Sequence, residues 1–134
     1  MITPDSTPAD IAVGVVGLGL MGCSICTCLL MAGHKVIAIA AIPADLDHAA
    51  HRITAHLRKS VAEGLISESP EHYLANLTIT DNYACLAETG LVIECTLENI
   101  DIKKSVYHKI ESVVTDETLL ASNTSAIPIS ILQQ

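Results

Sequence analysis

The sequence contains few aromatic side chains and little positive charge. Among its 134 residues there is no Phe and no Trp, and there are only three Tyr. Seven Lys and Arg stand against fifteen Asp and Glu, which gives a formal net charge of -8. Nucleic acids and anionic membrane surfaces need clustered positive charge, and single strands also stack on aromatic rings. We therefore expect neither as a partner, and backbone dipoles would have to hold any anionic ligand.

A disulfide framework is also missing. The five cysteines fall within expected helices or strands and not in loop-rich segments: Cys23, Cys26, Cys28, Cys85 and Cys95. Reduced thiols in a cytoplasmic protein are the simplest interpretation, with an organelle matrix as the alternative. Only Cys23 and Cys26 share a helix face, so we expect the first three cysteines to be small core residues and not metal ligands.

Charged residues are absent from residues 11–33. Hydropathy alone would suggest a membrane helix there, but four glycines interrupt its early part and no basic stretch precedes it. The segment instead predicts a buried strand, a glycine turn and a helix. Residues 1–10 are expected to be a disordered lead-in to a single domain over residues 11–134.

The glycines of this segment form a recognisable pattern directly after an apolar run. The stretch 13–16 leads into Gly17, Gly19 and Gly22, the GxGxxG spacing of a dinucleotide-binding strand-turn-helix unit. The first glycine permits a tight turn, the second lets backbone approach a pyrophosphate, and the third lets helix and strand pack closely. The anion would then lie on unpaired N–H groups at the helix N-terminus. A tight turn that binds nothing is the alternative.

Strands and helices are expected to alternate along the whole chain. The predicted strands are 11–16, 35–39, 77–80, 91–95 and 119–121, and the predicted helices are 20–32, 44–65, 83–88 and 102–114. Continuous apolar strands separated by helices predict a parallel sheet covered on both faces. We therefore predict an α/β fold of the Rossmann type, a doubly wound and mainly parallel sheet in three αβα layers.

Polar residues follow two of the later strands. Glu98 and Asn99 come after the strand 91–95, and Asn123 to Ser125 come after the strand 119–121. Open α/β sheets bind ligands at the carboxyl ends of their strands, so these residues predict a nicotinamide or flavin nucleotide site.

Each of these polar groups also has an ordinary interpretation. Glu98 and Lys103 would suit a solvated pair at a helix N-terminus, where an acid favours the helix dipole. Asn123 and Ser125 would suit turn or cap positions before Pro128.

Together the segments resemble the N-terminal NAD-binding domain of the L-3-hydroxyacyl-CoA dehydrogenase family, from about residue 12 to residue 132. The resemblance rests on the loop GLGLMG, on AGHKV at the entry to the second strand, on VIECTLENIDIKK and above all on ASNTS. GLGLMG alone also resembles the 3-hydroxyisobutyrate and 6-phosphogluconate dehydrogenases, whereas the ENxxxK and SNTS segments favour the hydroxyacyl-CoA branch. A non-catalytic nucleotide-binding or structural module is a further hypothesis.

The resemblance implies NAD as cofactor, with hydride passing between the 3-carbon of an L-3-hydroxyacyl-CoA and the nicotinamide ring in fatty acid beta-oxidation. Gly17, Gly19 and Gly22 would hold the pyrophosphate. Ser125 would hydrogen-bond and orient the substrate oxygen. The other implied site residues are Leu18, Leu20 and Met21 as backbone donors, Glu98 and Lys103 near the nicotinamide, and Asn123 beside cofactor and substrate.

One position departs from the family's pattern. NAD sites carry an acid at the end of the second strand, about 20 residues beyond the loop, that accepts from the adenosine ribose hydroxyls. Ala40 stands there, and losing such a bond costs ~1.5 to 3 kcal/mol. We therefore expect weakened NAD affinity and poor discrimination against NADP. We place Asp45 and Asp47 a helical turn too far away to accept from the ribose hydroxyls in place of that acid. We expect Asp45 to share a solvent-exposed helix face with His48 and His51.

The resemblance also implies catalytic residues that this sequence lacks. The family's general base is a histidine paired with a glutamate, both downstream of the SNTS segment, in a helical catalytic and dimerisation domain that would follow Gln134. A histidine is the natural acceptor for the hydroxyl proton as hydride leaves. We expect this chain to bind cofactor without turnover, as a fragment of a longer homodimeric enzyme that acts on acyl-CoA. A stand-alone nucleotide-binding protein is the alternative.

Overall fold

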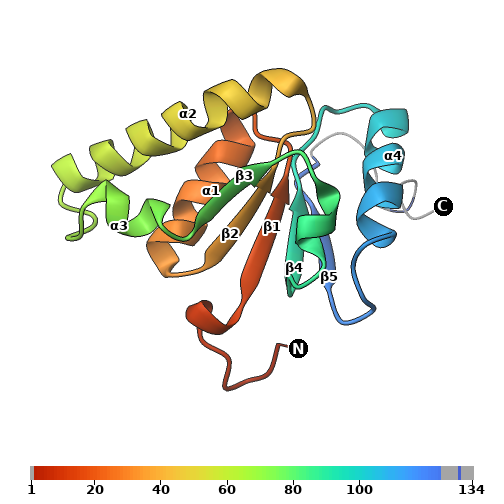
Figure 1. The fold of residues 1–134 in the computed structure, drawn as a ribbon, viewed down its shortest axis with the longest axis horizontal. Helices are drawn as coiled ribbons and strands as arrows, with labels where there is room; N and C mark the ends of the chain where they lie inside the picture. The colour runs from red at the N-terminus through yellow and green to blue at the C-terminus, as the bar shows by residue number, and fades with distance from the viewer. Residues whose placement is uncertain (1, 125–129, 131–134) are drawn as a thin grey trace.

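The computed structural model describes residues 2–124 and residue 130. Its strands form one five-stranded sheet in the order β3-β2-β1-β4-β5, with every neighbouring pair parallel (Figure 1). The predicted Rossmann-type α/β fold is therefore confirmed. The strands are β1 Ala12–Val16, β2 Lys35–Ile39, β3 Leu77–Thr80, β4 Leu91–Glu94 and β5 Leu119–Ser122.

The helices cover both faces of the sheet, as predicted. They are α1 Leu20–Ala32, α2 Pro43–Ala62, α3 Pro70–Leu74 and α4 Ile100–Glu111, with short 3-10 helices at Pro8–Asp10 and Tyr83–Leu86. Val15 packs in a buried cluster with Leu30 of α1 and Leu57 of α2, whereas Val16 packs in another with Ile110 of α4. Because successive side chains of a strand point to opposite faces, α1 and α2 lie on one face and α4 on the other.

The ends of the helices have local causes. Helix α1 ends at Gly33, whose φ of 100° is a left-handed conformation that glycine adopts without steric cost. Helix α2 begins at Pro43, where the ring fixes φ and no N–H bond is lost. Helix α3 was not predicted, because its five residues are too few to show a period, although Ser69 and Pro70 form a helix-start signal.

Residues 1–10 are expected to be a disordered lead-in, and the described part of this segment contains one short helix. Pro8–Asp10 forms a 3-10 helix, and the Thr7 backbone N–H donates to Asp10 Oδ2 at 2.9 Å. Elsewhere, no helix in the described part of the chain is both long enough and apolar enough to cross a membrane.

Candidate functional site

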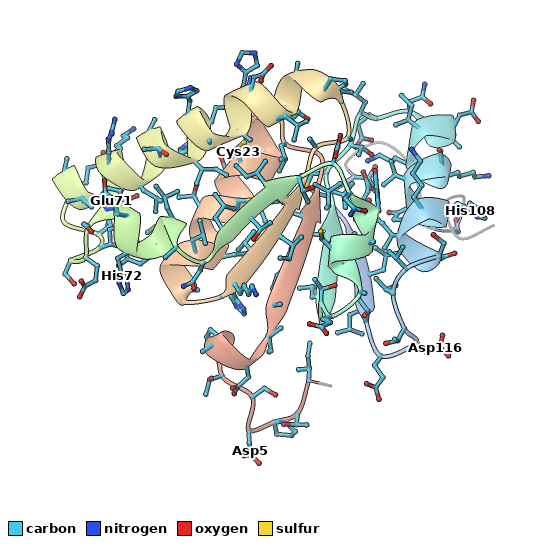
Figure 2. All side chains as sticks on the ribbon, in the orientation of Figure 1. Asp5, Cys23, Glu71, His72, His108 and Asp116 are labelled. Carbon is cyan, nitrogen blue, oxygen red and sulfur yellow. The ribbon has the colours of Figure 1, made fainter. Side chains whose placement is uncertain are left out.

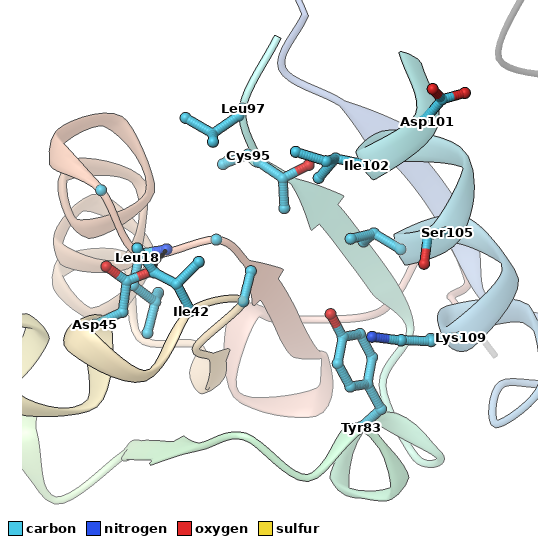
Figure 3. A pocket seen from close by; sticks show the side chains of 15 residues that line it. Leu18, Ile42, Asp45, Tyr83, Cys95, Leu97, Asp101, Ile102, Ser105 and Lys109 are labelled. Atoms are coloured by element: carbon cyan, nitrogen blue, oxygen red, sulfur yellow. Dashed lines mark hydrogen bonds between the residues drawn. The ribbon is translucent and has the colours of Figure 1, made fainter. Parts of the chain in front are cut away.

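A cavity of about 420 Å³ lies at the carboxyl ends of β1, β2 and β4 (Figure 3). Its walls include Gly17 to Gly19, the turn at Ala41 and Ile42, the segment 95–97 and one side of α4. Open α/β sheets bind their ligands at this edge. The glycine loop and the end of β4, which the sequence places at one cleft, do line the same cavity.

The first and third glycines of the loop are required by the fold itself. Gly17 has a φ of 97°, and a Cβ on it would lie 2.7 Å from the Cys95 carbonyl oxygen. A Cβ on Gly22 would lie 1.9 Å from the Gly17 carbonyl oxygen. Both clashes are with backbone, which cannot turn aside as a flexible side chain can. A loop that binds nothing would need these two glycines as much as a binding loop does.

Gly19 is different. It is the N-cap of α1 with a φ of -73°, which any residue adopts, and a Cβ on it would meet no atom of the described residues within 4 Å. Neither backbone conformation nor packing therefore calls for glycine at this position. The missing side chain leaves open space in front of the N-terminus of α1, where a ligand can approach the backbone closely.

The N-terminus of α1 offers hydrogen-bond donors to that space. The first N–H groups of a helix have no carbonyl partner within it, which here concerns Leu20, Met21 and Gly22. The first turn holds no acidic residue, and the side chains of Leu20 and Met21 are 75% and 57% exposed. Unpaired N–H groups and the helix dipole together favour an anion at this end of the helix.

Leu18, a predicted donor, already has partners within the protein. Its N–H donates to Asp45 Oδ2 at 3.3 Å. Its carbonyl oxygen accepts from Arg52 Nη1 at 3.1 Å and from the Cys23 thiol at 3.3 Å. Two side chains of α2 therefore hold both backbone groups of this loop residue, and a cofactor would compete with Asp45 for the Leu18 N–H.

The expectation that Asp45 lies on a wetted helix face is wrong. Asp45 is only 7% exposed, so it does not share a wetted face with His48 and His51, which are exposed. It lines the cavity beside Leu18 (Figure 3), and its reach toward a ribose stays a prediction. Asp45 lines the cavity because α2 begins at Pro43, only a short turn after β2, so that Asp45 falls in the first helical turn next to the loop.

A buried ionic network lies at the end of β4. The fully buried Glu94 side chain accepts from Lys103 Nζ at 2.7 Å, from Ser122 Oγ at 2.6 Å and from Tyr107 OH at 3.1 Å. The Thr96 backbone N–H also donates to Glu94, at 2.6 Å. Because a charge is costly to bury without partners, this set of bonds is what allows Glu94 to lie inside the fold.

Glu94 is held in its charged form. Burial acts to raise its pKa, but hydrogen bonds from Lys103, Ser122 and Thr96 outweigh burial and hold the pKa of Glu94 below its usual value. Burial, together with the nearby Glu94 charge, raises the pKa of Tyr107 to about 12, so its hydroxyl stays protonated and donates. The sequence analysis assigned no role to Glu94, although an acid within an apolar strand is a signal of such a network.

The structure excludes a solvated Glu98 and Lys103 pair. The side chain of Lys103 is 0% exposed, and its ammonium lies 3.6 Å from Glu98 Oε1 in addition to its bond with Glu94. The first turn of α4 is instead capped by Asn99, whose side chain accepts from the Ile102 N–H at 3.0 Å. A contact between Lys103 and the nicotinamide stays a prediction, since Glu94 holds the ammonium here.

The two polar segments identified in the sequence do meet. Strand β5 pairs with β4, and beyond that pairing the Asn123 N–H donates to the Glu94 carbonyl oxygen at 2.8 Å. The Thr124 hydroxyl donates to Glu98 Oε2, also at 2.8 Å. Ser125 lies outside the described residues, so its role toward substrate stays a prediction, as does that of Asn123.

The cysteines differ in exposure. Cys23 and Cys26 are buried core residues, as predicted, with Cys23 between α1 and α2 (Figure 2). Cys28 was expected in the core but is exposed, as is Cys85, and Cys95 lines the cavity. Burial raises the pKa of Cys26, and burial with the Glu94 charge raises the pKa of Cys95 to about 11.

The rate of thiol labelling should separate the exposed cysteines from the others. We expect an aromatic disulfide reagent at pH 8 to modify Cys28 and Cys85 rapidly, and the remaining thiols slowly, because only exposed thiolates react. Absorbance of the released thiol counts the fast phase, and all five cysteines should react in denaturant. A fast phase of more than two thiols would contradict either the burial of Cys23 and Cys26 in α1 or the raised pKa of Cys95.

Comparison with known proteins gives matches consistent with this geometry. Residues 12–134 match the family described as 3-hydroxyacyl-CoA dehydrogenase, NAD binding domain. A 3-hydroxybutyryl-CoA dehydrogenase of Mycobacterium tuberculosis is 36% identical over 119 residues, which are 87% of this chain and 42% of that protein. A glyoxysomal fatty acid beta-oxidation multifunctional protein of Brassica napus is 31% identical over 119 residues, 88% of this chain and 16% of that protein.

The fold is also similar to that of solved structures. The crystal structure of M. tuberculosis FadB2 superposes with a TM-score of 0.84 at 35% sequence identity, over 90% of this chain and 43% of that chain. The chain therefore spans less than half the length of these relatives.

Proposed function

Because this chain belongs to the 3-hydroxyacyl-CoA dehydrogenase family, to whose NAD-binding domain it corresponds, we propose that it binds NAD in the cavity at the carboxyl edge of the sheet. The observation that carries the proposal is Gly19. A Cβ there would meet no atom of the described residues within 4 Å, so the fold has no need of glycine at this position. A dinucleotide whose pyrophosphate approaches the backbone does need it.

The residues of the loop would divide the binding between them. The N–H groups of Leu20, Met21 and Gly22 would donate to the pyrophosphate, while Gly17 and Gly22 keep loop and helix close enough to present them. Glu98 and Asn123, at the ends of β4 and β5, would face the nicotinamide half. NAD, when bound, accepts a hydride from the substrate carbon.

We propose further that the reaction served is oxidation of an L-3-hydroxyacyl-CoA to the 3-ketoacyl-CoA in fatty acid metabolism. The support is the family, together with relatives named as 3-hydroxybutyryl-CoA dehydrogenase and as a beta-oxidation protein. Among the described residues that line the cavity there is no histidine, and His72 and His108 lie on the outside of the fold (Figure 2). On this proposal the chain alone binds cofactor without turning over substrate, because no histidine among the described residues lies at the cavity to accept the hydroxyl proton.

Replacing Gly19 with aspartate tests the cofactor proposal. The side chain has room and aspartate is a good N-cap, so the variant should fold. Its carboxylate would stand where the pyrophosphate binds, and like charges in contact cost several kcal/mol, so NADH binding should weaken by at least about 100-fold. Titration followed by NADH fluorescence measures this without interference from tryptophan, which the sequence lacks.

Gly64→Asp is the matched control. It adds the same side chain beyond the end of α2, where a Cβ would again meet no atom of the described residues within 4 Å. The φ of 73° at Gly64 strains any side chain, so this control should lose some stability, but Gly64 does not line the cavity and the NADH affinity should stay unchanged. Equal NADH affinity of Gly19→Asp and the wild type would make the loop a plain strand-to-helix turn. Failure of the wild type to bind either NADH or NADPH at millimolar concentration would favour a structural role for the fold.

A further inference from the structure

The end of β2 lacks the acceptor that a dinucleotide site uses for the adenosine ribose. Ala40 is 5% exposed, and its N–H donates to the Thr80 carbonyl oxygen at 2.8 Å. Its side chain has no oxygen to offer, and Ala41, the next residue, has none either. A ribose beside the glycine loop would therefore find no acid at the position where NAD sites carry one.

A carboxylate reaches the same corner of the cavity from another element. Asp45 lies in the first turn of α2, lines the cavity together with Ala41 and Ile42, and contacts the Leu18 N–H through Oδ2 at 3.3 Å (Figure 3). The side chain is 93% buried by the fold, being 7% exposed. A carboxylate has two oxygens and about four acceptor positions, and the Leu18 bond uses one of them.

The cations near Asp45 do not make this corner a phosphate site. Arg52, about two turns further along α2, donates through Nη1 to the Leu18 carbonyl oxygen at 3.1 Å, and it does not line the cavity. Lys109 lies across the cavity, with its ammonium 5.5 Å from the centre of the Tyr83 ring, and Asp101 lines the same wall. Of the charged residues that line the cavity, Asp45, Asp101 and Lys109, Asp45 is the one that hydrogen-bonds to the glycine loop.

We propose that Asp45 replaces the missing acid of β2: it accepts from the adenosine ribose hydroxyls and disfavours a 2′-phosphate, so that the chain selects NAD over NADP. This inference rests on the proposed function of the cavity. It also reverses the expectation of poor discrimination drawn from Ala40, because the acceptor comes from the first turn of the helix and not from the strand.

Asp45→Asn tests the assignment in parallel titrations with NADH and NADPH at one ionic strength. Asparagine keeps an acceptor for the Leu18 N–H, so the loop should stay in place. The wild type should bind NADH more tightly than NADPH. The variant should bind NADH about fivefold more weakly, as expected when a charged acceptor becomes neutral, and NADPH more tightly because the repulsion is gone.

Asp47→Asn removes the same charge from an exposed position on the same helix and should change either affinity by less than about twofold, since exposed charges are screened. The assignment of Asp45 is overturned if Asp45→Asn lowers the affinities for NADH and NADPH equally, or if it changes neither affinity. It is also overturned if the wild type binds NADPH more tightly than NADH. The proposed function would still stand in those cases, provided that the wild type binds NADH and Gly19→Asp does not. If the wild type binds neither NADH nor NADPH, both the proposed NAD binding and the assignment of Asp45 are wrong.

Discussion

Replacing Glu94 with glutamine is expected to lower the free energy of unfolding by about 3 to 5 kcal/mol, because it leaves the buried ammonium of Lys103 without its carboxylate. The two groups lie 2.7 Å apart, and neither side chain is exposed. Glu98 is a poor substitute, since it lies at 3.6 Å and is 36% exposed. Urea unfolding followed by circular dichroism measures the loss.

The surface pair of Lys59 and Glu63 supplies the matched control. These side chains are 75% and 53% exposed and 3.9 Å apart, so Glu63→Gln should change stability by less than about 1 kcal/mol. The double variant Glu94→Gln/Lys103→Met removes both buried charges and should recover much of the lost stability. Similar small losses for Glu94→Gln and Glu63→Gln would contradict the buried pair.

Replacing Gly22 with alanine is expected to lower the free energy of unfolding by about 2 to 4 kcal/mol and to abolish NADH binding. Its Cβ would lie 1.9 Å from the Gly17 carbonyl oxygen, so α1 must move away from the loop. Alanine is favoured over glycine within a helix by about 1 kcal/mol, so a loss of stability here points to the clash and not to helix propensity. Thermal unfolding and NADH titration of the same sample measure both effects.

Gly19→Ala separates the two roles of glycine in this loop. With no atom of the described residues within 4 Å of the added Cβ, this variant should unfold like the wild type and lose affinity for NADH only. A Gly22→Ala variant as stable as Gly19→Ala would show that the loop and α1 are less closely packed than the structure has them.

The regular elements were the most predictable part of the fold. The bounds of α1, β2 and β3 agree with the sequence prediction, because apolar runs, glycines and turn residues mark their ends. Helix α4 was expected from 102 and begins at Ile100, after Asn99, whose side chain caps the helix by accepting from the Ile102 N–H. This capping signal is local, but the sequence prediction assigned Asn99 to the ligand site instead. Helix α3 was missed because a single turn carries no periodic signal.

Side-chain partners in the site were less predictable than the elements that carry them. The sequence indicates that the strand ends after β4 and β5 approach each other, and the Thr124 to Glu98 bond agrees with this. The sequence does not indicate that Lys103 points inward to Glu94. Because lysine side chains are exposed to solvent in most proteins, a lysine in the first turns of a helix suggests a surface position.

The sequence by itself determined the family, the parallel sheet and the position of the glycine loop, because each depends on local order along the chain: apolar period, turn chemistry and motif spacing. The tertiary structure decided three further features: that packing does not require glycine at Gly19, that Asp45 contacts the Leu18 N–H, and that Glu94 pairs with Lys103. These depend on distances between residues far apart in sequence, such as Leu18 and Asp45. Packing fixes those distances, and a pattern of residue types along the chain does not contain them.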